Sequence, residues 1–287
     1  MSQETFGFVE PPYDPRVEPL TLGAGRVFVG TCGWSYKDWV GPFYPSGTKA
    51  AAMLEYYAER FPAVEVDATY YRIPSASAFA GMAARTPAAF RFSVKVPGSL
   101  THLPVETGLG VHDDARVFRE ALEPLAASGK LAAVLAQFPY SFHPSATTHG
   151  YLRALREALA DLPVICEFRS REWQRPATLE LLHEIDAGWC NVDEPHFEQL
   201  LHPSSDVVGS IAYARFHGRN AKQWWRGDNV ERYDYAYSPD ELLPWAERVA
   251  EMAASAKQTF AFFNNHRFGK AVKSADLFAG LLGGGVA

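Results

Sequence analysis

RVFVGTCGW, residues 26–34, is rich in β-branched and aromatic side chains and has a glycine next to its last residue, which is the pattern of a buried strand that leads into a loop. Seven further runs of this kind follow it along the chain. They are AVEVDATYYR (63–72), FRFSVKVP (90–97), LAAVLAQFP (131–139), PVICEFR (163–169), WCNVDEP (189–195), IAYARFHG (211–218) and TFAFFNNH (259–266). We therefore expect eight strands.

Helical spacing of apolar residues fills most of the gaps between these runs, and only 195–210 lacks it. The helical segments are 50–61, 75–85, 115–127, 146–162, 177–187, 239–256 and 271–282. Eight strands that alternate with helices predict an α/β fold, a single (β/α)8 TIM-like barrel. The barrel should span 26–287 and follow an extended, proline-rich N-terminal arm, 1–25. A doubly wound open sheet is the alternative, but no GxGxxG motif follows any strand.

Composition narrows the class of protein. The chain has 287 residues, with 47% hydrophobic and 21% charged residues and a net charge of −6, which is typical of globular proteins and excludes disorder, collagen and coiled coil. No apolar run approaches the ~18 residues of a membrane-spanning helix, so we expect no membrane partner. The mild acidity disfavours a broadly basic surface for nucleic acid.

Three cysteines without a CxxC pair predict neither a disulfide framework nor a zinc ribbon. The first residues lack the basic and apolar regions of a secretory leader, and we expect a cytoplasmic protein.

The expected connections after strands are longer than those after helices. Long ones cover 35–48, 98–114, 194–210 and 218–238. Barrel enzymes carry their working loops at the carboxyl ends of the strands. We therefore expect the functional site at that end.

Polar residues stand at alternate positions near the ends of seven of the eight runs, where alternate side chains point into a barrel. Those expected to face inward are Glu65, Asp67, Thr69, Lys95, Gln137, Glu167, Arg169, Asn191, Asp193, Arg215, His217, Asn264 and His266, with Asn265 on the opposite face of its strand.

This set combines cations with carboxylates. The guanidinium and ammonium groups of Lys95, Arg169, Arg215 and Arg219 suit a phosphate or carboxylate ligand. Glu167, Asp193 and His217 are candidates for general acid and base. No HExxH motif or close histidine pair occurs, so the spacing assigns no metal or cofactor. A lattice of salt bridges that merely fills the barrel mouth is the alternative interpretation.

Two segments are rich in aromatic residues, TCGWSYKDWVGPFYP (31–45) and RFHGRNAKQWWRGDNVERYDYAYSPDEL (215–242). Trp34, Tyr36 and Trp224 within them are candidates for a wall that stacks on a ring of the ligand. Packing of these loops into small satellite cores is the alternative.

Several long motifs resemble the YecE-like family, a domain of unknown function with the number 72. They include GTCGWSYKDWVGPFYP (30–45), VEVDATYYRIP (64–74), FRFSVKVP (90–97), QFPYSF (137–142), RFHGRN (215–220) and FAFFNNH (260–266). The resemblance runs from Val27 to the last helix and implies a TIM-like barrel, without an activity. That family usually has Ser where Cys32 stands and Asn where Asp67 stands.

The positions that match its motifs add Tyr71 to the candidates for ligand binding. The candidate residues that match the motifs of that family are Trp34, Tyr36, Glu65, Thr69, Tyr71, Lys95, Gln137, Glu167, Arg169, Asp193, Arg215, His217, Gly218, Arg219, Asn264, Asn265 and His266.

We therefore predict an enzyme that binds a small anionic or phosphorylated ligand at the barrel mouth. The first alternative is a nucleic-acid binder or phosphodiester hydrolase that uses the arginine-aromatic loop. The second is a ligand sensor or scaffold without catalysis. The sequence does not determine the substrate, the cofactor or the oligomeric state.

Overall fold

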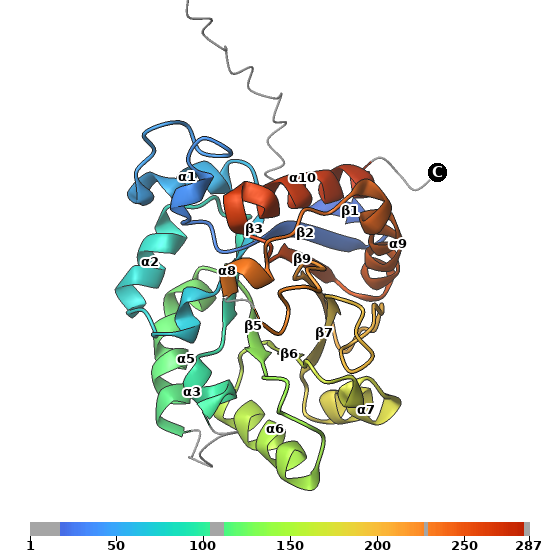
Figure 1. Ribbon diagram of the computed structural model, residues 1–287. Coiled ribbons are helices and arrows are strands. Elements are labelled where there is room, and N and C mark those ends of the chain that lie inside the picture. The colour runs from blue at the N-terminus through green and yellow to red at the C-terminus, as the bar shows by residue number, and fades with distance from the viewer. Residues whose placement is uncertain (1–17, 104–111, 227–228, 284–287) are drawn as a thin grey trace, which may run out of the picture.

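The computed structural model describes residues 18–103, 112–226 and 229–283 (Figure 1). Its strands are β1 (Leu20–Leu22), β2 (Gly25–Cys32), β3 (Ala63–Val66), β4 (Arg91–Lys95), β5 (Leu131–Gln137), β6 (Val164–Glu167), β7 (Gly188–Asp193), β8 (Ile211–Phe216) and β9 (Gln258–Phe263). From β2 to β9 each strand pairs in parallel with the next, and β9 pairs with β2. The sheet is therefore a closed barrel of eight parallel strands, which confirms the predicted TIM-like fold.

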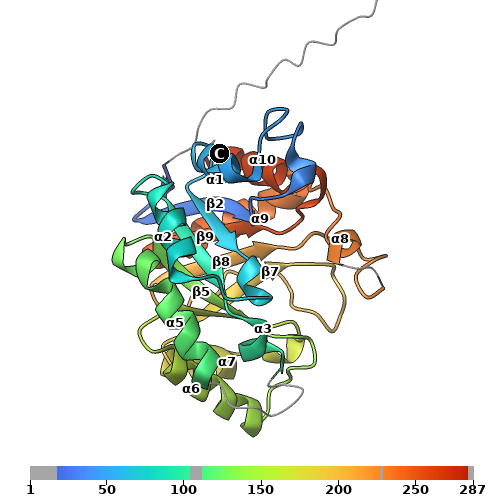
Figure 2. The same ribbon diagram turned by 90° about the vertical axis from the view of Figure 1, so that its left-hand side faces the viewer.

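Helices surround the barrel (Figures 1 and 2). They are α1 (Met53–Ala58), α2 (Ala76–Ala84), α3 (Gly98–Thr101), α5 (His112–Ala127), α6 (Ala146–Leu159), α7 (Pro176–Glu184), α8 (Asn229–Arg232), α9 (Pro239–Ser255) and α10 (Lys270–Gly283). Capping boxes at Ser145 and Ser238 fix where α6 and α9 begin. As predicted, no helix lies between β7 and β8. Among the described helices, none has the length and apolarity needed to cross a membrane.

The described part of the predicted arm consists of residues 18–25. It contains β1, which pairs antiparallel with the start of β2 and places Leu20 opposite Val27. Residues 1–17 of that prediction lie outside the described residues. β1 thus adds a short strand beside β2, outside the closed ring of eight.

The barrel has separate inner and outer cores. Inside, the rings of Phe28 and Phe260 stack at 4.9 Å, and Tyr213 contacts Phe260 and Phe262. Outside, Phe216 of β8 packs on Trp245 of α9. Because neighbouring residues of a strand point to opposite faces, Arg215 must face inward where Phe216 faces outward.

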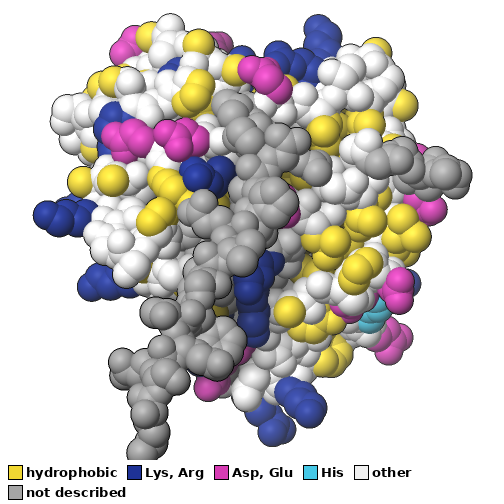
Figure 3. All heavy atoms as spheres, turned by 90° about the horizontal axis from the view of Figure 1, so that it is seen from above, with side chains coloured by type: hydrophobic (Ala, Val, Ile, Leu, Met, Phe, Trp, Pro, Cys, Tyr) yellow, Lys and Arg dark blue, Asp and Glu magenta, His cyan; other side chains and the backbone are white. Residues whose placement is uncertain are grey.

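The surface seen from the side of α1 and α10 carries no extended field of one charge. Figure 3 shows acidic and basic side chains interspersed among hydrophobic ones on the described part of this face. This pattern agrees with the small net charge of −6.

Candidate functional site

A cavity of about 530 Å³ opens at the carboxyl ends of the strands. Its walls come from residues that end or follow most of the barrel strands, and the loop after β8 contributes several of them. The lining residues are Tyr36, Asp67, Tyr70, Tyr71, Lys95, His102, Gln137, Pro139, Tyr140, Arg169, Leu200, Trp224, Trp225, Arg232, Tyr233, Asn264 and His266. The cavity therefore lies at the end of the barrel where the sequence predicted the site.

Arg215 is the centre of a buried ionic network beneath the cavity. Its side chain is 1% exposed, and its two terminal nitrogens lie 2.6 Å from Glu65 Oε1 and 2.7 Å from Glu167 Oε2. Asp67 Oδ1 lies farther away, at 3.6 Å. A buried charge is tolerable only when it is paired in this way.

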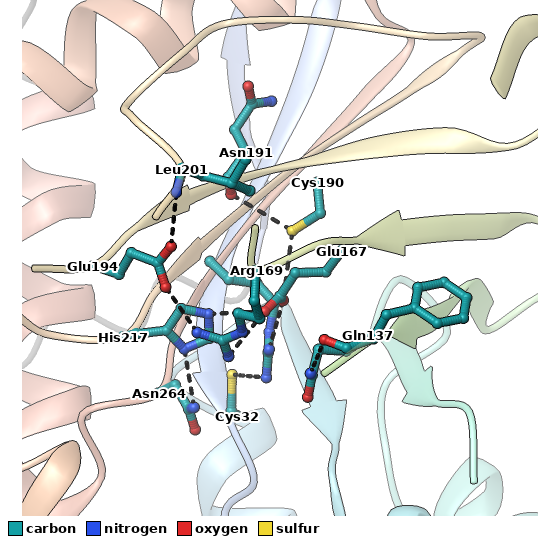
Figure 4. Close-up of polar contacts among 12 residues, drawn as sticks. Cys32, Gln137, Glu167, Arg169, Cys190, Asn191, Glu194, Leu201, His217 and Asn264 are labelled. Carbon is teal, nitrogen blue, oxygen red and sulfur yellow. Dashed lines mark hydrogen bonds and ion pairs between the residues drawn. The ribbon is translucent and has the colours of Figure 1, made fainter. Parts of the chain in front are cut away.

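Arg169 connects that network to the cavity. Its guanidinium lies 3.0 Å from Glu167 Oε1 and 2.9 Å from Glu194 Oε2 (Figure 4). The other oxygen of Glu194 accepts a hydrogen bond of 3.2 Å from the backbone N–H of Leu201. Two carboxylates therefore hold the Arg169 guanidinium in place, and Glu194 also ties it to the loop after β7.

His217 lies on the other side of Glu167. Its Nε2 is 3.1 Å from Glu167 Oε1, and its Nδ1 is 3.2 Å from the amide nitrogen of Asn264 (Figure 4). Burial, with Arg169 nearby, lowers the pKa of His217 to about 3. The ring is thus neutral at neutral pH, donates from Nε2 to Glu167 and accepts at Nδ1 from Asn264.

The same environment gives the buried carboxylates different pKa values. Burial would raise the pKa of Glu167, but Arg215, Arg169 and His217 together lower it well below its usual range. Burial outweighs the neighbouring arginine for Glu65 and Glu194, and it raises the pKa of each to about 7. Glu167 is therefore the permanent anion of the network.

One group of described side chains has the donor types of a metal site. The thiol of Cys32 and the carboxylates of Glu65 and Asp67 offer ligand atoms within 4.8 Å of one another. However, the guanidinium of Arg215 lies 3.5 Å from Cys32 Sγ and 2.6 Å from Glu65. Arg215 already supplies the positive charge that a cation would bring, so these residues do not fit a metal ion in this arrangement.

The structure brings together most of the residues predicted for the site. The cavity lining includes Tyr36, Asp67, Tyr71, Lys95, Gln137, Arg169, Trp224, Asn264 and His266. Glu167, Arg215 and His217 are buried directly beneath them and outside the lining.

Asp193 and Arg219 correct the sequence prediction, because both lie on the outer side of the barrel wall. Asp193 pairs in register with Phe216, which packs on α9. Its Oδ1 accepts hydrogen bonds from the Trp245 indole at 2.8 Å and from Arg219 at 2.7 Å. The assumed alternation was one residue out of step, and such a shift turns every side chain of a strand to the other face. Figure 4 shows Asn191, two positions earlier, pointing away from the network.

Asn265 also faces outward, as its position opposite Asn264 implied. Its amide nitrogen donates to the carbonyl of Tyr235 and to Ser274 Oγ in α10. It is therefore a link between the barrel and its helices and does not line the cavity.

Thr69 and Trp34 are likewise absent from the lining. β3 ends at Val66, and Thr69 lies in a 3-10 helix (Ala68–Tyr70), where its hydroxyl donates to the carbonyls of Val66 and Lys95. The backbone of Trp34 accepts a hydrogen bond from Tyr44, and its side chain packs against the core.

Strand alternation in the sequence did not indicate Glu194 or several of the lining residues. Glu194 follows Asp193 directly, so the opposite alternation in WCNVDEP would have selected it. The missed lining residues are Tyr70, His102, Pro139, Tyr140, Leu200, Trp225, Arg232 and Tyr233. All lie in loops or short helices, where strand alternation gives no signal.

These features define a (β/α)8 barrel protein with a cationic, aromatic-lined cavity above a floor of buried ion pairs. More particularly, the chain belongs to the family described as "Protein of unknown function DUF72", whose model matches residues 28–286.

Individual relatives support the same assignment. UPF0759 protein YunF of Bacillus subtilis is 31% identical over 272 residues, which cover 89% of this chain and 94% of that protein. A crystal structure of a DUF72 family protein from Thermotoga maritima has a TM-score of 0.84 and 39% identity, and the match covers 90% of this chain and 99% of that one. A DUF72 family protein from Enterococcus faecalis gives a TM-score of 0.79 at 29% identity, with 90% and 95% coverage.

Proposed function

We propose that this protein is an enzyme that binds a small anionic ligand of the phosphate-ester type in the cavity at the barrel mouth. The position of the cavity supports an enzyme, since barrel active sites lie at this end. The charge of its lining supports the ligand class.

The observation that carries the proposal is an excess of cations over acids among the described lining residues. Lys95, Arg169 and Arg232 line the cavity, whereas Asp67 is the one acid among the described lining residues. Within the described ranges, neither Lys95 nor Arg232 forms an ion pair, and the buried Nε of Arg232 has no hydrogen-bond partner. An anion with several oxygens would pair with the Lys95 ammonium group and with the terminal nitrogens of the Arg232 guanidinium group.

The buried residues then have positioning roles. Glu167 holds Arg169 and Arg215, and His217 braces Glu167 from the other side. Of these four residues, Arg169 lines the cavity, whereas Glu167, Arg215 and His217 are buried outside the lining. A ligand in the cavity therefore contacts Arg169 and does not contact Glu167 or His217. General acid–base chemistry falls to lining groups such as His102, whose pKa burial lowers to about 4.

Calorimetric titration with inorganic phosphate tests the binding. We expect Lys95→Ala and Arg232→Ala each to weaken phosphate binding at least tenfold, because each removes a charge-assisted contact. Lys273→Ala and Arg119→Ala, at exposed positions on outer helices, are the matched controls and should bind like the wild type. Absence of phosphate binding, or equal losses in the controls, would refute the proposal.

Turnover of a panel of phosphate esters tests the enzyme assignment. Release or rearrangement of the esters, abolished in Lys95→Ala, supports it. Tight binding without any reaction across the panel would instead indicate a ligand sensor.

A second candidate function, nucleic-acid binding, has one observation in its favour. Lys222, Trp225 and Arg226 are exposed on the loop after β8, beside the cavity. However, Trp224 is buried, and its ring contacts the guanidinium groups of Arg169 and Arg232. A single-stranded oligonucleotide that binds with steep salt dependence would support this function, and one that fails to bind would exclude it.

A further inference from the structure

Asp67 differs from the rest of the cavity lining in charge and in bonding. Its side chain is 25% exposed, and its carboxylate accepts no hydrogen bond from the described residues. The nearest cationic group, Arg215, lies 3.6 Å away, which is beyond hydrogen-bond distance. A cavity that binds an anion thus also presents a carboxylate oxygen that lacks a donor.

The side-chain amides of Gln137 and Asn264 provide further hydrogen-bond acceptors in the cavity lining. Gln137 uses its Nε2 to donate to the carbonyl of Phe138, and Asn264 uses its Nδ2 at His217. Each of the two side chains keeps a carbonyl oxygen that accepts no hydrogen bond from the described residues. Asp67, Gln137 and Asn264 together form a set of acceptors around the same cavity as the cations.

The ligand must be complementary to the cavity in charge and in hydrogen bonding. A ligand that satisfies both sets must carry an anionic group for the cations and several donors for the acceptors. Hydroxyl groups are such donors, and they can also accept from the tyrosine hydroxyls in the lining. Tyr36 and His266, whose rings stack 4.8 Å apart and 9° from parallel, both line the cavity and add aromatic surface that a ring or carbon chain of the ligand can contact.

We infer that the ligand is a phosphorylated sugar or polyol, whose phosphate contacts Lys95, Arg169 and Arg232 and whose hydroxyls donate to Asp67, Gln137 and Asn264. This inference rests on the proposed function, because the cations must bind the phosphate. It adds the second half of the ligand, which the cations alone do not specify.

The experiment compares phosphates with and without hydroxyls. Calorimetry of the full chain uses inorganic phosphate, phenyl phosphate, glycerol 3-phosphate, ribose 5-phosphate and glucose 6-phosphate. At least one of the three hydroxylated esters should bind ten times more tightly than phenyl phosphate. In Asp67→Ala this advantage should fall at least tenfold, while inorganic phosphate binds as well as before or better, because a negative charge has been removed.

Asp67→Asn provides a second variant of the same shape. Its amide oxygen still accepts a hydrogen bond but carries no charge, so we expect a smaller loss of the advantage than in Asp67→Ala. Thermal unfolding of both variants verifies that they fold.

The possible results distinguish failure of the proposed anion site from failure of the inferred ligand class. If no hydroxylated ester binds more tightly than phenyl phosphate, or if Asp67→Ala keeps the advantage, the inference is wrong and the proposed anion site stands. If none of the five compounds binds, the proposed function itself fails, and the inference fails with it.

Discussion

Glu167 and Glu194 show how one arginine can leave two carboxylates in different states. Both contact Arg169, but Glu167 also contacts Arg215 and His217, whereas Glu194 has one cationic partner and a backbone N–H. Burial therefore prevails at Glu194 and raises its pKa to about 7, while the charges prevail at Glu167. The charge behind Arg169 thus changes near neutral pH.

This difference predicts that anion binding weakens as the pH rises. Below pH 7 Glu194 is protonated and neutral, and above pH 7 its negative charge opposes an anion at Arg169. Glu65, with a pKa of about 7, likewise gains a negative charge beside Arg215 as the pH rises, and this charge also disfavours a bound anion. Sulfate is a suitable probe because its charge is constant in this range. Its affinity should fall between pH 6 and pH 8, as measured by calorimetry.

Glu194→Gln should flatten this pH profile in part, while Glu120→Gln, at an exposed position on α5, should leave it unchanged. A sulfate affinity that rises with pH, or an identical profile in Glu194→Gln, would contradict the role of Glu194.

Among the elements, the segment from β8 to α9 does the most to shape the cavity. Gly218, directly after His217, has φ +85, and a Cβ there would lie 2.6 Å from Tyr235 Cβ. Only glycine fits so tight a turn without strain. Beyond it, Asp193 binds Arg219, Tyr237 and Trp245, and so joins the end of β7 to this segment and to α9.

Asp193→Asn should therefore lower stability without removing the anion site. Loss of a buried charge from a paired cluster costs about 3–5 kcal/mol. We expect a loss of that size in the free energy of unfolding by urea, and phosphate affinity within about threefold of the wild type. Arg219→Lys, which keeps the charge, should cost less. Unchanged stability together with lost turnover would instead restore Asp193 as a catalytic residue.

At the scale of the whole molecule, closure of the barrel by β2 and β9 brings distant parts of the chain into one cavity. Tyr36 follows β2, His266 follows β9, and their rings stack. A ligand bound there contacts residues from most strands and from the loop after β8. Binding should therefore stabilise the fold as a unit.

Thermal unfolding measures this coupling. A ligand at 100 times its Kd adds about 2.7 kcal/mol of stability, which corresponds to a rise in Tm of roughly 4–5 °C for a chain of this size. Phosphate at that concentration should produce such a shift in the wild type. At the same phosphate concentration, Lys95→Ala should show a much smaller shift and Lys273→Ala the full one. Equal shifts in all three proteins would place the bound phosphate elsewhere.

Local sequence patterns are enough to predict the barrel and the end of it that carries the cavity. Strand-like runs, helical spacing and long loops after strands are local properties, and each is set by the residues of its own segment. Strand alternation also predicted that Lys95, Gln137 and Arg169 face the barrel mouth, and all three line the cavity. Lys95 and Gln137, at the ends of their strands, are each flanked by buried apolar residues, so the sequence shows there which face points inward.

Contacts between distant segments set which face of β7 points into the barrel and which loop residues reach the cavity. All six residues of β7 are buried, because the barrel interior covers one face and helices cover the other, so its sequence holds no contrast between inside and outside. Asp193 could therefore be placed only by the register of β7 with β8. Arg232 and Tyr233 reach the cavity through the path of a loop, which depends on packing between segments distant in the chain.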